Sequence, residues 1–176
     1  MDISRIQSLV AAIPDFPQPG IMFRDITPVL DDAAAFHQVI DHLHARCLAL
    51  AGGPPALVVG MESRGFLFGA PLALKLRVGF APVRKPGKLP RRTLKVEYTK
   101  EYGKDSLEIH HDAIRPGTRV VIVDDLLATG GTARASGDLV AQAGGKVVGY
   151  MFVIELDALG GRRLLGEAPV DALLHY

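Results

Sequence analysis

Residues 120–132, VVIVDDLLATGGT, decide the fold and pose the first question about function. Four β-branched residues, typical of a strand buried on both faces, run directly into the adjacent acids Asp124 and Asp125. Leucines and an alanine then lead into a loop of threonine and glycine, ahead of a helical pattern at 130–144. A buried strand followed by a helix is the repeating unit of a parallel sheet, and here the strand ends in two negative charges.

Similar strand and helix patterns lie on both sides of this stretch. Together with the strand at 119–125, apolar runs predict strands at 56–61, 79–85, 146–156 and 170–176. Further helical patterns occupy residues 32–51, 63–76 and 158–166. The alternation predicts an α/β fold with a mostly parallel central sheet and helices on both faces.

Three segments fall outside this alternation. Residues 3–12 predict a short amphipathic helix, and residues 13–30 contain four prolines and a glycine, so they must be extended or turning. Residues 86–112 are polar, with alternating patterns on either side of a turn, which predicts a flexible arm built as a two-stranded hairpin. With 176 residues, the whole chain, residues 1–176, is expected to form a single domain.

The composition excludes several classes of protein. The formal net charge of +1 provides no general attraction to nucleic acid or to an anionic membrane. No apolar run approaches the length of a membrane span, and no signal peptide opens the chain. The single cysteine, Cys47, cannot form an internal disulfide and is expected to be a packing residue, which favours a cytoplasmic location.

The acid pair and the loop after it indicate a ribose phosphate as ligand. Ligands of a parallel sheet bind beyond the carboxyl ends of its strands, where Asp124 and Asp125 are expected. A glycine-rich loop before a helix N-terminus can direct backbone N–H groups at a phosphate, while carboxylates suit the hydroxyls of a ribose. The alternative is a helix N-cap with a spare acid, but a cap needs one acid and two adjacent ones repel. A Walker loop is excluded in its usual form, because Gly-Lys-Ser/Thr is absent.

Several motifs in one order resemble the adenine phosphoribosyltransferase family. Residues 120–132 are similar to the phosphoribosyl pyrophosphate (PRPP) motif of type I phosphoribosyltransferases. The other similar segments are FPQPGIMFRDITPVL (16–30), ESRGFLFGAPLA (62–73), VRKPGKLP (83–90) and EYTKEYGKDSLEIH (97–110). The resemblance implies transfer of ribose 5-phosphate from PRPP to N9 of adenine, which yields AMP and pyrophosphate. It also implies an N-terminal hood, residues 1–30, that binds the base, and a catalytic arm at 86–112.

The resemblance implies a role for each matching residue. It makes Asp124 and Asp125 ligands of the ribose hydroxyls and implies a non-proline cis peptide between Glu62 and Ser63. The residues implied to hold the 5-phosphate are Ala128, Thr129, Gly130, Gly131 and Thr132. The residues implied to hold pyrophosphate are Arg64, Arg84, Lys85, Lys88 and Tyr102, and Arg64 is also expected to be catalytic.

The implied base site and catalytic acid come from three further segments. Glu101, in the arm, matches the family's catalytic acid at N7 of adenine, and Tyr102 and Lys104 would help the arm close. The residues implied to contact adenine are Met22, Phe23, Arg24 and Leu156. Without the resemblance, Glu101 reads as a solvated surface charge and Leu156 as ordinary core.

The expected cofactor is Mg²⁺, held mainly by PRPP oxygens rather than by the protein alone. The expected partners are adenine, PRPP, AMP and pyrophosphate, with a second copy of the chain in a homodimer and neither nucleic acid nor membrane. One alternative is a phosphoribosyltransferase for 6-oxopurines. Such enzymes resemble this chain at the PRPP loop but use a lysine near the base to bind O6. Here Lys146 is the last lysine and the apolar run after it contains none, which favours adenine. A second alternative is a non-catalytic PRPP-binding regulator.

Overall fold

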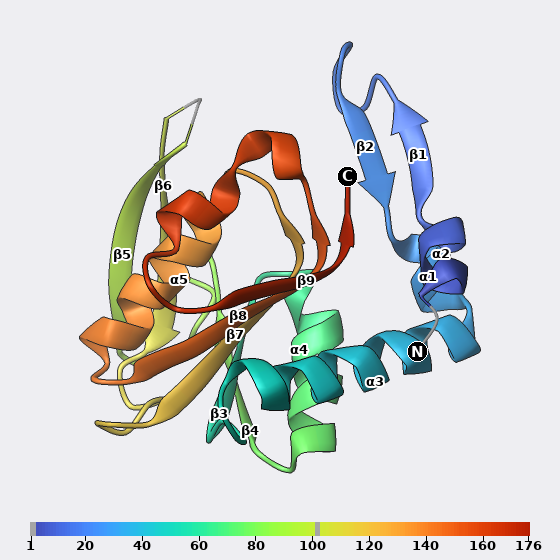
Figure 1. The fold of residues 1–176 in the computed structure, drawn as a ribbon. Helices are drawn as coiled ribbons and strands as arrows, with labels where there is room; N and C mark the ends of the chain where they lie inside the picture. The colour runs from blue at the N-terminus through green and yellow to red at the C-terminus, as the bar shows by residue number, and fades with distance from the viewer. Residues whose placement is uncertain (1–2, 101–102) are drawn as a thin grey trace. The chain divides into compact units, whose positions relative to one another are not determined.

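The computed structural model describes residues 3–100 and 103–176. The chain divides into two compact units, one ending at His42 and the other beginning at Leu43. Figure 1 shows the order of the elements along the chain, and helix α3 (Ala33–Leu50) continues from the first unit into the second. The single domain expected over residues 1–176 stays a prediction.

The first unit contains a hairpin between short helices. Helix α1 (Ser4–Leu9) ends earlier than the predicted 3–12, because strand β1 (Ala11–Pro14) pairs antiparallel with β2 (Met22–Asp25). The proline-rich segment is therefore extended, as predicted, but it contributes to a β-hairpin whose turn includes a cis peptide between Phe16 and Pro17. It then forms helix α2 (Thr27–Asp31), which the sequence pattern did not indicate and which begins with a proline in its first turn.

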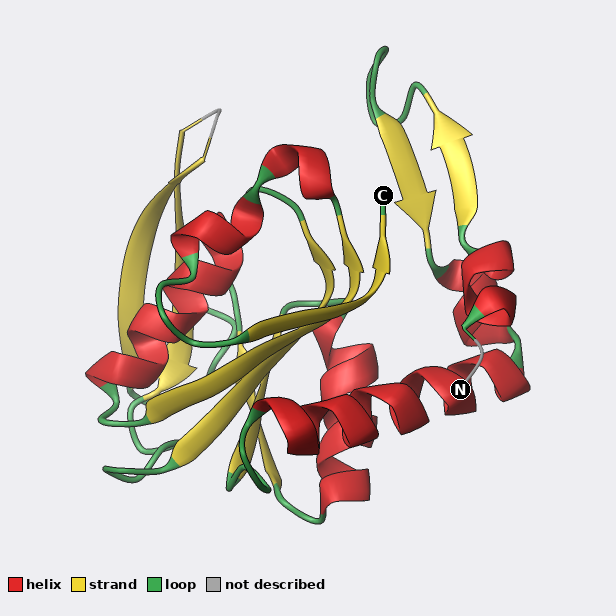
Figure 2. Cartoon of the chain, viewed as in Figure 1, coloured by secondary structure: helices red, strands yellow, loops and turns green. Residues whose placement is uncertain are grey.

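The second unit is built on a parallel sheet of five strands in the order β4-β3-β7-β8-β9. The strands are β3 (Leu57–Met61), β4 (Gly79–Val83), β7 (Arg119–Leu127), β8 (Lys146–Glu155) and β9 (Val170–His175). All five were predicted, and β7 runs two residues further than expected, past the acid pair. Helices α4 (Gly65–Leu76) and α5 (Gly131–Gln142) cover opposite faces of the sheet (Figures 1 and 2), so the predicted α/β fold is confirmed.

Alternate residues of the strands define the core of this unit. Val120 and Ile122 of β7 pack in one cluster with Leu139 and Val140 of α5, and all four are fully buried. Cys47 is also fully buried, as predicted, and burial raises the pKa of its thiol to about 11. A thiol with so high a pKa is a packing group rather than a nucleophile.

The polar segment at 86–112 forms the predicted hairpin. Strands β5 (Thr93–Lys100) and β6 (Gly103–His110) pair antiparallel, from Thr93 opposite His110 to Lys100 opposite Gly103. The predicted helix at 158–166 is instead two 3-10 helices, Asp157–Leu159 and Gly161–Leu164, separated by Gly160. Within the described part of the chain, no helix is both long and apolar enough to span a membrane.

Candidate active site

A cavity of about 410 Å³ lies at the carboxyl end of β3 and β7. This is the edge of a parallel sheet at which ligands usually bind. Three of its lining residues, at 62–64, follow β3, and the others form one continuous stretch, 124–133, from the end of β7 into the first turn of α5. The structure thus brings Arg64 together with all seven predicted ribose-phosphate residues: Asp124, Asp125, Ala128, Thr129, Gly130, Gly131 and Thr132.

Backbone packing shapes the loop before α5. Gly130 has a φ of +86°, in the left-handed region that favours glycine, and a Cβ there would lie 2.4 Å from the carbonyl oxygen of Gly161. A Cβ on Gly161 would in turn lie 2.2 Å from the carbonyl oxygen of Ala128. The loop therefore lies directly against the turn at Gly161. The first residues of α5, whose N–H groups have no acceptor within the helix, line the cavity.

The acid pair is electrostatically strained, and one arginine offsets part of the strain. The Nε of Arg64 lies 2.6 Å from Oδ2 of Asp125, which is 6% exposed. Asp124 accepts a hydrogen bond of 2.9 Å from the backbone N–H of Asp125. Removal from water, and then the neighbouring charge of Asp125, raise the pKa of Asp124 well above its ordinary value. A ligand with hydrogen-bond donors or positive charge would favour the ionised pair.

The cis peptide joining Glu62 and Ser63, implied by the resemblance, is present at the end of β3. Glu62 accepts hydrogen bonds from the backbone N–H of Lys85 at 2.9 Å and from Nε of Arg84 at 3.2 Å. The Lys85 N–H, and then the Arg84 charge, lower the pKa of Glu62. Arg84 also donates to the carbonyl oxygen of Lys88 at 3.2 Å. One carboxylate therefore joins the end of β3 to the cations that follow β4.

Among the described residues, the three cations that follow β4 do not line the cavity beside Asp124. Arg84 is half-buried, and Lys85 forms an ion pair with Asp105 of β6. The hydroxyl of Tyr98, in β5, donates to the same Asp105 oxygen at 3.1 Å and lies 3.3 Å from the hydroxyl of Thr132. The hairpin thus contacts both the first turn of α5 and the end of β4.

The residues predicted to contact adenine are distributed over both units of the chain. In the first unit, Met22 is 49% exposed, while Phe23 and Arg24 are half-buried. The ring of Phe23 meets Phe16 edge to face, with centroids 5.1 Å apart. In the second unit, Leu156 follows β8 and is half-buried, and its N–H donates to the carbonyl oxygen of Leu127 at 2.9 Å.

Two predicted residues, Glu101 and Tyr102, lie outside the described residues. They connect Lys100 of β5 to Gly103 of β6, which are paired with each other. Their predicted roles as catalytic acid and pyrophosphate ligand therefore stay predictions.

Residues that the sequence did not single out for this site are Tyr98, Asp105 and Gly161, while Glu62 was named only for the cis peptide that joins it to Ser63. Glu62, Tyr98 and Asp105 are polar residues in segments whose motifs were recognised, but nothing in the sequence shows which partner each side chain meets. Gly161 has one local signal, since it belongs to a pair of adjacent glycines, and such pairs mark turns.

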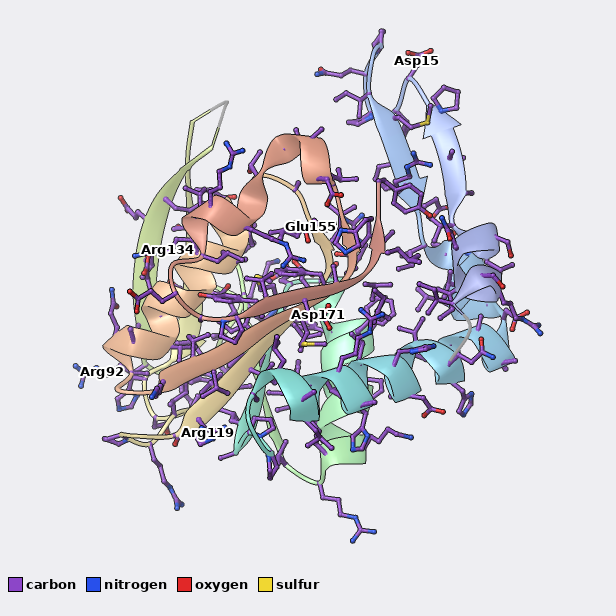
Figure 3. All side chains as sticks on the ribbon, viewed as in Figure 1. Asp15, Arg92, Arg119, Arg134, Glu155 and Asp171 are labelled. Carbon is purple, nitrogen blue, oxygen red and sulfur yellow. The ribbon has the colours of Figure 1, made fainter. Side chains whose placement is uncertain are left out.

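A second polar cluster lies at the ends of β8 and β9. Among the residues that the structure describes, Glu155, Asp157 and His175 form the one group of three possible metal ligands. Glu155, labelled in Figure 3, is 3% exposed, and Nε of Arg162 lies 2.7 Å from each of its carboxylate oxygens. Because a guanidinium occupies both oxygens, this cluster is better described as an ion-pair network than as a cation site.

Comparison with known proteins gives one consistent result. The phosphoribosyl transferase domain family matches residues 29–166. An adenine phosphoribosyltransferase of Rippkaea orientalis is 55% identical over 171 residues, which cover 97% of this chain and 99% of the relative. The crystal structure of the Thermoanaerobacter pseudethanolicus adenine phosphoribosyltransferase is similar with a TM-score of 0.94 and 54% identity, covering 99% of this chain and 100% of that one.

A third similar protein was crystallised with ligands. The Saccharomyces cerevisiae adenine phosphoribosyltransferase was solved in complex with D-2,5-dideoxy-2,5-imino-altritol 1,6-bisphosphate and adenine. It matches with a TM-score of 0.93 and 46% identity, over 97% of each chain.

Proposed function

The chain belongs to the phosphoribosyl transferase family, and from this membership we propose how its residues carry out the reaction. Its function is that of an adenine phosphoribosyltransferase, a pentosyltransferase that forms AMP and pyrophosphate from adenine and PRPP. Full-length identity above half to such enzymes is the observation that carries this conclusion. The cavity beside the acid pair is consistent with it, since it combines carboxylates with an anion-binding loop.

We propose that the cavity holds the ribose 5-phosphate part of PRPP. The loop at 128–132 would hold the phosphate through backbone N–H groups and threonine hydroxyls at the positive end of α5. Asp124 and Asp125 would accept hydrogen bonds from the two ribose hydroxyls. Charge-assisted hydrogen bonds are stronger than neutral ones, and they would fix the sugar ring while positive charge develops at C1.

Pyrophosphate is assigned to Arg64, Arg84, Lys85, Lys88 and Tyr102. When the bond between C1 and the pyrophosphate oxygen breaks, negative charge accumulates on the departing group, and fixed cations lower the energy of that state. Arg64 has the best support, because it borders the cavity and its guanidinium is oriented by the ion pair with Asp125. It is therefore proposed as a catalytic residue as well as a ligand of pyrophosphate.

The residues proposed to contact adenine are Met22, Phe23, Arg24 and Leu156. An aromatic ring and an aliphatic side chain suit the flat faces of a purine, and backbone N–H and C=O groups can pair with its amine and N1. Glu101 is proposed to hold or deliver a proton at N7 and to orient N9 towards C1.

Mg²⁺ is the proposed cofactor. The cavity offers the carboxylates Asp124 and Asp125, hard oxygen donors of the type this ion prefers, and they are too few to complete its coordination without PRPP oxygens. When bound, Mg²⁺ would neutralise part of the charge of the pyrophosphate group. A homodimer and a cytoplasmic location complete the proposal, the latter supported by the buried, unpaired Cys47.

The deciding experiment measures base specificity with purified protein. Adenine, hypoxanthine and guanine are each supplied with PRPP and Mg²⁺, and nucleotide formation is followed by chromatography. We expect kcat/KM for adenine to exceed that for hypoxanthine by at least roughly a thousandfold, since a site that pairs with an amine leaves buried groups unmatched by a carbonyl. Comparable rates with hypoxanthine or guanine would instead assign the chain to 6-oxopurines.

A further inference from the structure

Four side chains form a polar chain between the hairpin, the end of β4 and the phosphate loop. The Lys85 ammonium is paired with Oδ2 of Asp105, and the two side chains are 38% and 22% exposed. Tyr98 donates to the same Oδ2 at 3.1 Å, and its hydroxyl lies 3.3 Å from that of Thr132. The backbone N–H of Ser106 donates to the other Asp105 oxygen at 2.8 Å. The Asp105 carboxylate is therefore held in one orientation, towards Lys85.

We propose that Asp105 is a positioning residue that competes with pyrophosphate for the Lys85 ammonium, and that Tyr98 holds its carboxylate in place for this competition. The inference rests on the pyrophosphate role assigned to Lys85 above. It adds a residue to the site that weakens binding of the leaving group rather than strengthening it.

The physical reason is that one ammonium cannot serve two anions fully at the same time. For Lys85 to bind pyrophosphate, it must give up much of its contact with Asp105, and the carboxylate then remains as a negative charge near a polyanion. Both effects raise the free energy of the pyrophosphate complex. When pyrophosphate dissociates after the forward reaction, Asp105 recaptures Lys85, which favours release of this product.

Arg84 provides an internal comparison, because it also has a carboxylate partner. Glu62 accepts from the Arg84 side chain, but it accepts from the Lys85 backbone N–H as well, at 2.9 Å, and so joins two strand ends of the same sheet. Asp105 instead belongs to β6 of the hairpin. Release of Lys85 therefore removes an ion pair between the hairpin and the end of β4, while release of Arg84 leaves Glu62 bound to the backbone N–H of Lys85, so the ends of β3 and β4 stay joined.

A purely structural role for Asp105 predicts different behaviour. If the ion pair only fastened the hairpin, Asp105→Asn would lower the melting temperature and leave pyrophosphate affinity unchanged or weaker. If Asp105 competes for Lys85, the same variant binds pyrophosphate more tightly. Asparagine has nearly the same shape and still accepts from Tyr98, so the substitution removes mainly the charge.

The test measures the dissociation constant of Mg²⁺-pyrophosphate by calorimetry at fixed ionic strength. We expect Asp105→Asn to lower it roughly two- to fivefold, the range for a partly exposed ion pair. The matched control is Asp112→Asn, which removes the charge of a carboxylate paired with Arg91 near the open end of the same hairpin and should change the constant less than about 1.5-fold. An unchanged or increased constant in Asp105→Asn would overturn the proposal.

A second background separates this inference from the proposed function. Lys85→Met keeps the aliphatic stem and removes the ammonium. If it does not weaken pyrophosphate binding, the role of Lys85 itself is wrong. If it does, Asp105→Asn should change affinity less than about 1.5-fold in the Lys85→Met background, where no ammonium remains to be released. Equal effects of Asp105→Asn in both backgrounds would show that Asp105 acts on the polyanion directly, and would refute competition for Lys85.

Discussion

Replacement of Gly65 by alanine tests whether close backbone packing sets the geometry of the active site. Gly65 is the first residue of α4 and follows Arg64 directly. A Cβ at this position would lie 2.8 Å from the carbonyl oxygen of Val123, 2.8 Å from Oδ1 of Asp124 and 3.3 Å from Cα of Asp124. Its φ lies outside the left-handed region, so the obstacle to alanine is space rather than backbone conformation.

The size of the effect follows from these distances. Val123 belongs to the central strand of the sheet, with neighbours on both sides, so the start of α4 must move instead. An ordinary contact begins at 3.4 Å, so the required shift from 2.8 Å is about 0.6 Å. Overpacking of this kind costs about 1–3 kcal/mol of folding stability, which is roughly 2–12 °C in Tm for a chain of this size. Because a displacement of about 1 Å can cost 10²-fold in rate, we expect roughly a tenfold loss in kcat/KM for PRPP.

The assay combines thermal melting with kinetics at saturating adenine and varied PRPP. The matched control is Gly79→Ala, at the start of β4, where a Cβ would meet only the end of the Leu57 side chain at 3.1 Å. The control should keep kcat/KM for PRPP within about twofold, since the end of a side chain can move without displacing backbone. If Gly65→Ala also stays within twofold, contact between α4 and β7 does not position Arg64, and this reasoning fails.

Two further predictions concern the acids. Asp124→Asn should weaken PRPP binding yet raise the folding stability at neutral pH. Because the pKa of Asp124 is raised in the folded protein, the stability that its protonated form contributes is fully present below about pH 3.8 and is lost as pH rises through the folded-state pKa. Asparagine is neutral at every pH and does not lose this contribution. The stability advantage of Asp124→Asn over the native chain should therefore vanish when thermal unfolding is measured at low pH. An advantage that does not change with pH would show that ionisation of Asp124 is not its cause. Glu101→Gln should lower kcat roughly 10²–10⁴-fold with PRPP binding nearly unchanged, and full turnover in this variant would move proton handling to another group.

The sheet could be predicted because each strand is specified by local sequence. Strands β3, β7 and β8 are buried on both faces, so their residues form continuous apolar runs that need no knowledge of the neighbouring strand. The loop between β7 and α5, which lines the cavity, was predictable for a related reason, since its glycines and acids follow one another along the chain. Its proposed role as a phosphate site depends on a single stretch of chain, from β7 to α5.

Elements that depend on a distant partner were missed. The start of strand β1 was predicted as the end of a helix, because Ala11 and Ala12 have a high helix propensity. They form a strand only by pairing with Asp25 and Arg24 of β2. The same holds for the site. Asp105 meets Lys85 across 20 residues of chain, so the sequence showed two polar residues and not an ion pair. Such contacts follow from the register of β5 with β6 and from where the hairpin joins the sheet.

In the proposed ribose site, the acid pair is an unfavourable feature of the unliganded protein that would contribute to selectivity. In the folded protein, the ionised form of Asp124 is opposed by burial and by Asp125, and Arg64 offsets only part of this. A sugar hydroxyl that donates to such a carboxylate would form a charge-assisted hydrogen bond, worth about 1.5–3 kcal/mol. A ligand that presents a carbonyl or a phosphate to the same carboxylate adds repulsion instead. In the proposed ribose site, the two aspartates would thus discriminate by charge and donor pattern, and a neutral pair of amides would remove the strain together with the discrimination.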